Sequence, residues 1–164
     1  MLLRQRLIWI LLGLAAAAAI GYLLLGTQRA APNIAWTDLQ GKRQDLAALK
    51  GNVVLINFWA TTCTSCIAEM PKLVKLQESL HGKPYKTVAL AMSYDAPAQI
   101  RHYVAQTGLP FIVAHDRDGK AAAAFDNVAL TPTSFLIDTQ GNVVQRYLGE
   151  PDMQALEQTI LGLL

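Results

Sequence analysis

The chain has 164 residues, enough for one domain with a genuine hydrophobic core. Its 14 Lys and Arg and 12 Asp and Glu give a net charge of +2, and they form no basic run. That balance argues against nucleic-acid binding. Apolar residues make up 52% of the sequence, a share that the N-terminus raises.

An uncharged apolar run, 7–25, follows Arg4 and Arg6. As a helix it would be about 28 Å long, close to the hydrocarbon thickness of a bilayer. A cleaved signal peptide has a shorter apolar centre, and here the apolar residues continue beyond the alanines at 15–19. We therefore expect a signal anchor over 1–26 with a transmembrane helix at 7–25, and cleavage as the alternative. The leading arginines favour a cytoplasmic N-terminus, which would put the remainder in the periplasm, where disulfide chemistry is permitted.

A short polar linker, 27–33, separates the anchor from the predicted domain, 34–164. Residues 34–39 and 43–46 predict two short strands around a turn at Gly41.

The run 53–59 is apolar, β-branched and aromatic, and it has the length of a buried strand. The chain's two cysteines, Cys63 and Cys66, follow it and precede a helical pattern of apolar residues. The cysteines therefore lie where a strand ends and a helix begins. Free backbone N–H groups and the helix dipole at such a position favour a thiolate.

The spacing of Cys63 and Cys66 allows three interpretations. A structural disulfide would stabilise little, because its effect grows with the length of the loop that it closes. A closed zinc site needs four ligands, and the sequence has no second cysteine pair and no spaced histidine pair. Redox chemistry uses this spacing, because one thiolate attacks and the second resolves the mixed disulfide. We expect a redox pair, with metal delivery and a structural staple as alternatives.

Several motifs cluster around the cysteines: Asn57, Phe58-Trp59-Ala60, Cys63-x-x-Cys66 and Ile67-Ala68-Glu69-Met70-Pro71. Together they resemble the thioredoxin superfamily and, within it, the membrane-anchored TlpA/ResA-type disulfide reductases. The resemblance covers roughly 34–164. The chain departs from the family at Thr62, where Trp is frequent, and at Thr64-Ser65, where a proline is common.

Glu69 lies three residues after Cys66, on the same helical face. In an ordinary helix it would face solvent, but beside the inner thiol it could accept a proton during substrate reduction. The resemblance to the ResA type, which has an acidic residue at this step, favours the catalytic role. Asn57 stands where many thioredoxins carry a buried Asp, and the simplest expectation is an amide satisfied by backbone groups. The resemblance also predicts that Pro71 kinks a continuous helix, whereas local rules alone allow a helix that begins there.

The remaining pattern alternates between strands and helices. It predicts strands at 86–92, 111–115, 134–138 and 143–147, and helices at 97–107, 121–125 and 152–164. His81, His102 and His115 follow no ligand spacing, so we expect them at the surface or at strand ends.

Thr131-Pro132 precedes one of these strands, and an ordinary extended loop is one interpretation of it. The resemblance implies instead a cis peptide bond that faces the cysteine pair. Thr131 would then offer its backbone N–H and C=O to an extended substrate segment. The resemblance also assigns Pro132 and Trp59 to substrate binding.

The order of elements predicts an α/β fold, a thioredoxin-like α/β sandwich with a mixed central sheet, preceded by one N-terminal transmembrane helix. The expected activity is thiol–disulfide exchange with protein substrates, in which Cys63 attacks and Cys66 resolves. No cofactor is expected beyond the redox-active Cys63–Cys66 disulfide. The resemblance implies a reductase, a membrane thiol carrier as electron donor and apocytochromes c as substrates.

Two other functions are alternatives to this one. A copper-delivery protein would use Cys63, Cys66 and one histidine, but the histidines are scattered and there is no Met-rich segment. A peroxidase of the peroxiredoxin type is expected to have Thr at the position of Ala60.

Overall fold

The structure is a computed structural model that describes residues 9, 13 and 29–164. The transmembrane helix expected at 7–25 otherwise lies outside the described residues. Within the described ranges, no helix is long and apolar enough to cross a membrane.

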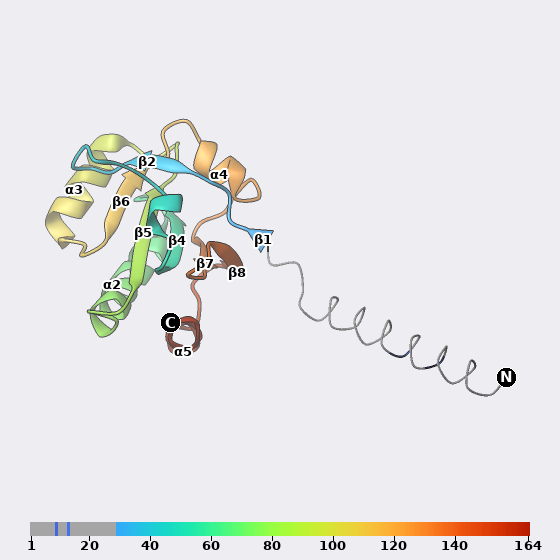
Figure 1. The fold of residues 1–164 in the computed structure, drawn as a ribbon. Helices are drawn as coiled ribbons and strands as arrows, with labels where there is room; N and C mark the ends of the chain where they lie inside the picture. Colours follow the sequence, from blue (N-terminus) through green and yellow to red (C-terminus); the bar gives the residue numbers. More distant parts are fainter. Residues whose placement is uncertain (1–8, 10–12, 14–28) are drawn as a thin grey trace.

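A mixed sheet of six strands, in the order β1-β8-β7-β4-β5-β6, forms the centre of the molecule (Figure 1). Three strands run parallel and three add to them in antiparallel fashion. The parallel strands are β4 (Val53–Trp59), β5 (Tyr85–Ala91) and β6 (Ile112–His115), and the others are β7 (Thr133–Ile137), β8 (Asn142–Leu148) and β1 (Arg29–Ala30). All seven residues of β4 are buried, as expected for a central strand covered on both faces.

The short strand β1 lies within the segment 27–33 that the sequence predicts as a linker. Arg29 pairs with Val143 of β8, and its guanidinium forms an ion pair with Asp126 at 2.6 Å. This segment is therefore attached to the edge of the sheet.

A separate hairpin of β2 (Ala35–Thr37) and β3 (Arg43–Asp45) turns through Gly41, whose φ of +87° favours glycine. An isolated bridge between Asp38 and Ala114 joins this hairpin to β6.

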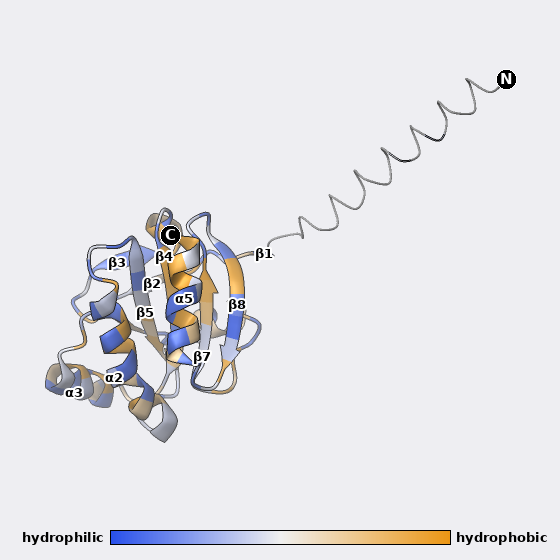
Figure 2. Ribbon diagram, turned by 90° about the horizontal axis from the view of Figure 1, so that it is seen from below, coloured by the Kyte–Doolittle hydropathy of each residue, from blue (hydrophilic) through white to orange (hydrophobic). Residues whose placement is uncertain are grey.

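Three of the four helices cover one face of the sheet, and the hairpin together with the fourth helix covers the other. Figure 1 shows β2 and α4 on one side of the sheet and α2 and α5 on the other, and Figure 2 shows α5 in front of the strands. The bounds are α2 (Thr64–Ser79), α3 (Pro97–Thr107), α4 (Lys120–Ala124), α5 (Met153–Leu163) and the 3-10 turn η1 (Ala47–Leu49). The predicted α/β sandwich with a mixed sheet is confirmed.

Helix α2 begins at Thr64 and continues past Pro71 to Ser79. The alternative in which a helix begins at Pro71 is therefore wrong. The cysteine pair consequently lies in the first turn of a long helix whose inner residues, from Cys66 to Leu76, pack against the sheet.

Candidate active site

The two cysteines lie at the start of α2, directly after the central strand. Cys63 is the N-cap of the helix, with extended backbone angles of φ −93° and ψ 104°, and it forms a disulfide with Cys66. The backbone N–H of Cys66 donates to the Cys63 Sγ at 3.2 Å. The Ser65 hydroxyl lies 3.4 Å from the same sulfur and is the donor, because a disulfide sulfur carries no hydrogen. After reduction, these donors would face and favour a Cys63 thiolate.

The two sulfurs differ in their access to solvent. Cys63 is half-buried, whereas Cys66 is 0% exposed on the inner side of helix α2. A substrate sulfur can therefore approach Cys63 but not Cys66. This asymmetry suits an attacking residue and a resolving residue.

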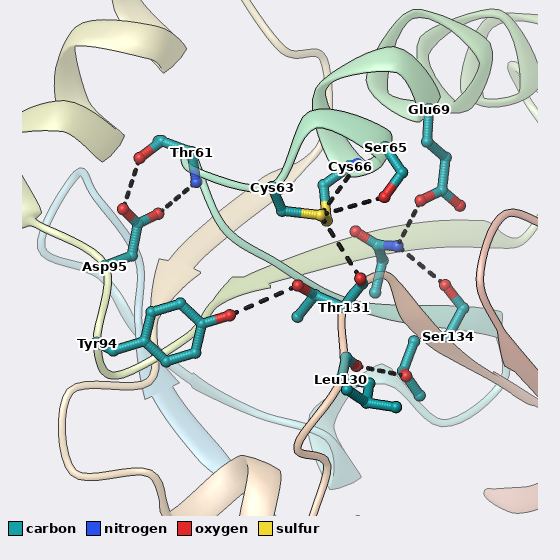
Figure 3. The surroundings of a disulfide bond; sticks show 12 residues. Thr61, Cys63, Ser65, Cys66, Glu69, Tyr94, Asp95, Leu130, Thr131 and Ser134 are labelled. Carbon is teal, nitrogen blue, oxygen red and sulfur yellow. Dashed lines mark hydrogen bonds between the residues drawn. A yellow bond between two sulfur atoms is a disulfide. The ribbon is translucent and has the colours of Figure 1, made fainter.

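The loop before β7 lies against the outer sulfur. Thr131 and Pro132 are joined by a cis peptide bond, as the resemblance implied. The Thr131 carbonyl oxygen is 3.6 Å from the Cys63 Sγ (Figure 3). Within the described part of the chain, the Thr131 backbone makes no main-chain hydrogen bond, so it could pair with an extended peptide. Pro132 is buried, and its carbonyl accepts from the N–H of Gly149.

Glu69 is buried rather than exposed, with only 1% of its surface accessible. Burial raises its pKa from 4.5 to about 7, an effect that a hydrogen bond from Asn57 partly opposes. Nearby Glu150 raises this pKa further and Lys72 lowers it. A carboxyl group with a pKa near neutrality can both take up and release a proton at physiological pH.

Asn57 connects Glu69 to the neighbouring strand. Its amide nitrogen donates to Ser134 Oγ at 2.9 Å and to Glu69 Oε2 at 3.4 Å. The expectation that backbone groups satisfy this amide is therefore wrong. Asn57 Oδ1 and Glu69 Oε1 are buried and have no partner among the described residues. The polar groups beneath the cysteine pair are thus incompletely satisfied, which is common where a site must exchange protons.

A second contact, which sequence reasoning missed, fixes the loop between β4 and α2. Asp95 is 3% exposed and accepts hydrogen bonds from Thr61 N at 2.6 Å and from Thr61 Oγ1 at 2.5 Å. Next to it, the Tyr94 hydroxyl lies 3.5 Å from Thr131 Oγ1 (Figure 3). These residues lie more than thirty positions from their partners, and no local motif marks them.

Trp59 does not occupy the position that the sequence suggested. Its side chain is 0% exposed, and its ring packs on Tyr103 with centroids 5.4 Å apart. It therefore supports the strand and helix α3 from inside, and its ring offers no surface to a substrate.

Among the described residues, no three His, Cys, Asp or Glu side chains form a group that could hold a metal ion. No observation therefore favours the copper-delivery alternative.

A disulfide at this helix start, on a mixed sheet of this topology, defines the class of thioredoxin-like thiol-disulfide oxidoreductases, and the chain has that activity. The Redoxin family model matches residues 27–160, and the chain belongs to that family.

Relatives and solved structures agree with this assignment. Thiol-disulfide oxidoreductase ResA of Bacillus thuringiensis is 39% identical over 127 residues, which are 77% of this chain and 72% of ResA. ResA of Bacillus subtilis is 33% identical and is matched over 73% of this chain and 65% of its own length. A solution structure from Neisseria meningitidis, assigned as a thioredoxin, shares 38% identity with a TM-score of 0.76, over 83% of this chain and 90% of that one. A Chlorobium tepidum structure assigned as the thiol:disulfide interchange protein DsbE shares 31% identity with this chain, with a TM-score of 0.76. The match covers 83% of this chain and 96% of that one.

Proposed function

We propose that the chain reduces disulfides of protein substrates on the periplasmic side of the bacterial cytoplasmic membrane, held there by the segment 7–25. The main support for this reaction is the difference in exposure between the two sulfurs. Cys63 is accessible beside the unpaired backbone of Thr131, while Cys66 is buried directly behind it. A substrate segment paired with Thr131 would bring its own sulfur to Cys63.

The reaction proceeds through two exchanges. The Cys63 thiolate attacks one sulfur of the substrate disulfide, and the other substrate sulfur leaves as a thiolate that takes up a proton. Cys66 then loses its proton and attacks the Cys63 sulfur, which releases the second substrate thiolate. Two electrons pass to the substrate, and the enzyme ends with the Cys63–Cys66 disulfide.

Glu69 is proposed to accept the Cys66 proton in the second step. Its burial below the helix, three residues after Cys66, places a carboxylate in the same low-dielectric environment as the inner sulfur. Its pKa of about 7 keeps a fraction of it ionised at neutral pH. Asn57 and Ser134 would orient the carboxylate for this transfer.

The enzyme must be reduced again after each cycle. We propose a membrane thiol carrier as the electron donor and apocytochromes c as one class of substrate. Both rest on the resemblance to TlpA/ResA-type reductases and on the expected membrane anchor.

The equilibrium potential of the Cys63/Cys66 couple tests the direction of transfer. A value near the roughly −270 mV typical of thioredoxin fits a reductase. A value near the roughly −120 mV of a strong oxidant would reverse the direction.

Trapping tests the roles of the two sulfurs. A Cys66→Ser variant should accumulate mixed disulfides with substrate, and Cys63→Ser should form none. Equal trapping by both variants would contradict the assigned roles. For the location, the full chain should sediment with membranes, whereas a chain that begins at residue 27 should not.

A further inference from the structure

The chain enters the sheet along its outer edge, from the end at which the cysteine site lies. β1 is the outermost strand and runs antiparallel to β8, with Arg29 paired to Val143. From Val143, β8 runs toward the cysteine site and ends at Leu148. Leu148 pairs with Thr133, which directly follows the cis-proline loop that contacts Cys63. Because β1 runs in the opposite direction, the chain before Arg29 arrives from the side of Cys63.

Only three residues, 26–28, connect β1 to the transmembrane helix that the sequence predicts at 7–25. A fully extended chain spans at most about 3.6 Å per residue, so the start of β1 lies within about 15 Å of the end of that predicted helix. The headgroup layer on each side of a bilayer is itself about 5–8 Å thick. If the anchor spans the membrane, the edge of the sheet that β1 forms is therefore held close to the bilayer surface.

Exposed apolar side chains lie along the same edge. Val144 and Leu148 of β8 are 43% and 64% exposed, and Leu130, just before the cis-proline loop, is 64% exposed. Thr133 connects two of them, because it pairs with Leu148 and donates its hydroxyl to the Leu130 carbonyl. We call β1, 144–148 and Leu130 together the β8 edge. Large apolar side chains exposed near one another mark a surface that contacts a partner or a membrane.

The polar groups of the β8 edge suit the headgroup layer rather than the hydrocarbon core. β1 pairs with only the first two residues of β8, so the outer side of 144–148 has no strand partner among the described residues. Its N–H and C=O groups need water or polar partners, which the headgroup layer supplies and the hydrocarbon core does not. Arg146 is exposed between Val144 and Leu148, and a guanidinium there can reach lipid phosphates while its stem stays on apolar surface.

We propose that the β8 edge lies on the surface of the bilayer, with its apolar side chains in the headgroup layer. The proposal rests on the proposed function, because it needs the anchor at 7–25. A substrate segment held at Thr131 would not account for the whole edge, since Val144 lies roughly 13 Å along β8 from Leu148, away from the cysteine site.

This placement brings the cysteine pair close to the membrane. β7 and β4 follow β8 in the sheet, so the end of β4 that leads to Cys63 lies roughly 10 Å from the β8 edge. Cys63 is then presented at the membrane surface, within reach of a partner embedded in the bilayer.

Photocrosslinking of the full chain, reconstituted into vesicles of phosphatidylethanolamine and phosphatidylglycerol, tests the contact. A benzophenone amino acid replaces Leu148 in one protein and Gln106 in another. Gln106 is an exposed residue of α3, which lies on the far side of the molecule from β1 (Figure 1). Irradiation should give at least about fivefold more lipid adduct from position 148 than from position 106. Equal yields would overturn the proposal, and so would adducts from position 148 to a second protein chain in place of lipid.

The apolar side chains are tested with the benzophenone at Val144. The double variant Leu130→Gln and Leu148→Gln should lower the yield of lipid adduct at least about threefold. Leu161→Gln with Leu164→Gln changes two exposed leucines at the end of α5, and this matched control should keep the parent yield. No loss in the first double variant, or an equal loss in both, would overturn the proposal.

Sedimentation of the same vesicles separates this proposal from the anchor on which it rests. If the full chain stays in the supernatant, the anchor fails and the placement of the β8 edge fails with it. If the chain sediments with the vesicles but position 148 gives no more lipid adduct than position 106, only the placement fails. Disulfide reduction by the Cys63–Cys66 pair, measured on the same protein, stands in either case.

Discussion

The two faces of β4 differ in what they contain. Toward the hairpin, Val54, Ile56 and Phe58 are apolar and buried. Toward α2, the same strand presents Asn57 and Trp59, each of which has a buried polar atom without a partner among the described residues. Alternate residues of β4 therefore contribute only apolar side chains to one layer and two side chains with unpartnered polar atoms to the other.

The contrast indicates a division of work between stability and chemistry. Aromatic rings of Phe58, Phe125 and Phe135 pack with centroid distances of 4.8 to 6.2 Å on the hairpin side. On the inner side of α2, the buried carboxyl of Glu69 lowers the stability of the fold but supplies a group that can hold a proton. Local departures from good packing are expected at functional sites, where other parts of the fold compensate for them. Changes on the two faces should therefore affect different measurements.

The largest effect on stability is expected on the hairpin side. Phe125→Ala should lower the free energy of unfolding by about 3–5 kcal/mol, because it leaves a cavity between two aromatic rings. The redox potential should change little, since Phe125 packs on the opposite face from the cysteines. Urea unfolding and glutathione equilibration measure the two quantities. A large change in potential in a folded Phe125→Ala protein would contradict the division, and Phe125→Leu is the milder control.

Glu69→Gln should change stability in the opposite direction. The pKa of Glu69 is about 7 in the folded chain and 4.5 as a reference, so the folded state retains a proton in this window. The free energy of unfolding should therefore fall as pH rises from 4.5 to 7, by up to about 3 kcal/mol. Glu69→Gln should remove this fall and be more stable than the parent at pH 8. Urea midpoints across the pH range measure it.

The same variant should be slower in the second exchange. Without a carboxylate to accept the Cys66 proton, release of substrate from the mixed disulfide should slow by about 100-fold near pH 7. Glu78→Gln changes an exposed carboxylate on the same helix and is the matched control. If both variants release substrate at the parent rate, the proton role of Glu69 fails, whatever the stability data show.

Local patterns in the sequence are sufficient for part of this picture. The apolar run of β4, the Cys63-x-x-Cys66 spacing and Thr131-Pro132 are contiguous signals, so the sheet and the outer sulfur could be predicted. The pair Asn57 and Ser134 could not, because seventy-seven residues separate them and only the pairing of β4 with β7 brings them together.

Strand β1 escaped prediction for a different reason. Two residues, Arg29 and Ala30, carry no periodicity, and their strand geometry comes from pairing with β8. Trp59 shows the limit of motif reasoning, because its position in a motif does not reveal whether the ring points inward.

The contact of Thr61 with Asp95 should have an intermediate effect. Asp95→Asn keeps the shape but loses the charge-assisted hydrogen bonds to Thr61, so it should cost about 2 kcal/mol of unfolding free energy. Thr61→Val keeps the N–H bond to Asp95 and removes the hydroxyl contacts to Asp95 and Gln99, so it should cost about 1 kcal/mol. Urea unfolding of the oxidised proteins measures both. If Thr61→Val lowered the free energy of unfolding more than Asp95→Asn, the Asp95 carboxylate would not be what fixes the loop between β4 and α2.

Tyr94→Ala should have the smallest effect, and only with protein substrates. The ring is 61% exposed and lies beside Thr131, so it can contact a substrate segment that pairs there. Loss of the Tyr94 ring should raise KM for the reduction of insulin about three- to fivefold and leave kcat unchanged. The reason is that the ring contacts the substrate equally in the bound state and in the transition state.

The matched substrate for this experiment is glutathione disulfide, which is too short to reach both the cysteine and the Tyr94 ring. Its reduction should proceed at the parent rate in Tyr94→Ala. Tyr94→Phe should match the parent with both substrates, because the hydroxyl contact at 3.5 Å is too long to contribute much. If glutathione disulfide and insulin are affected equally, Tyr94 acts on the cysteine pair itself. The Tyr94 ring would then have no part in binding, and substrate recognition would depend on the Thr131 backbone alone.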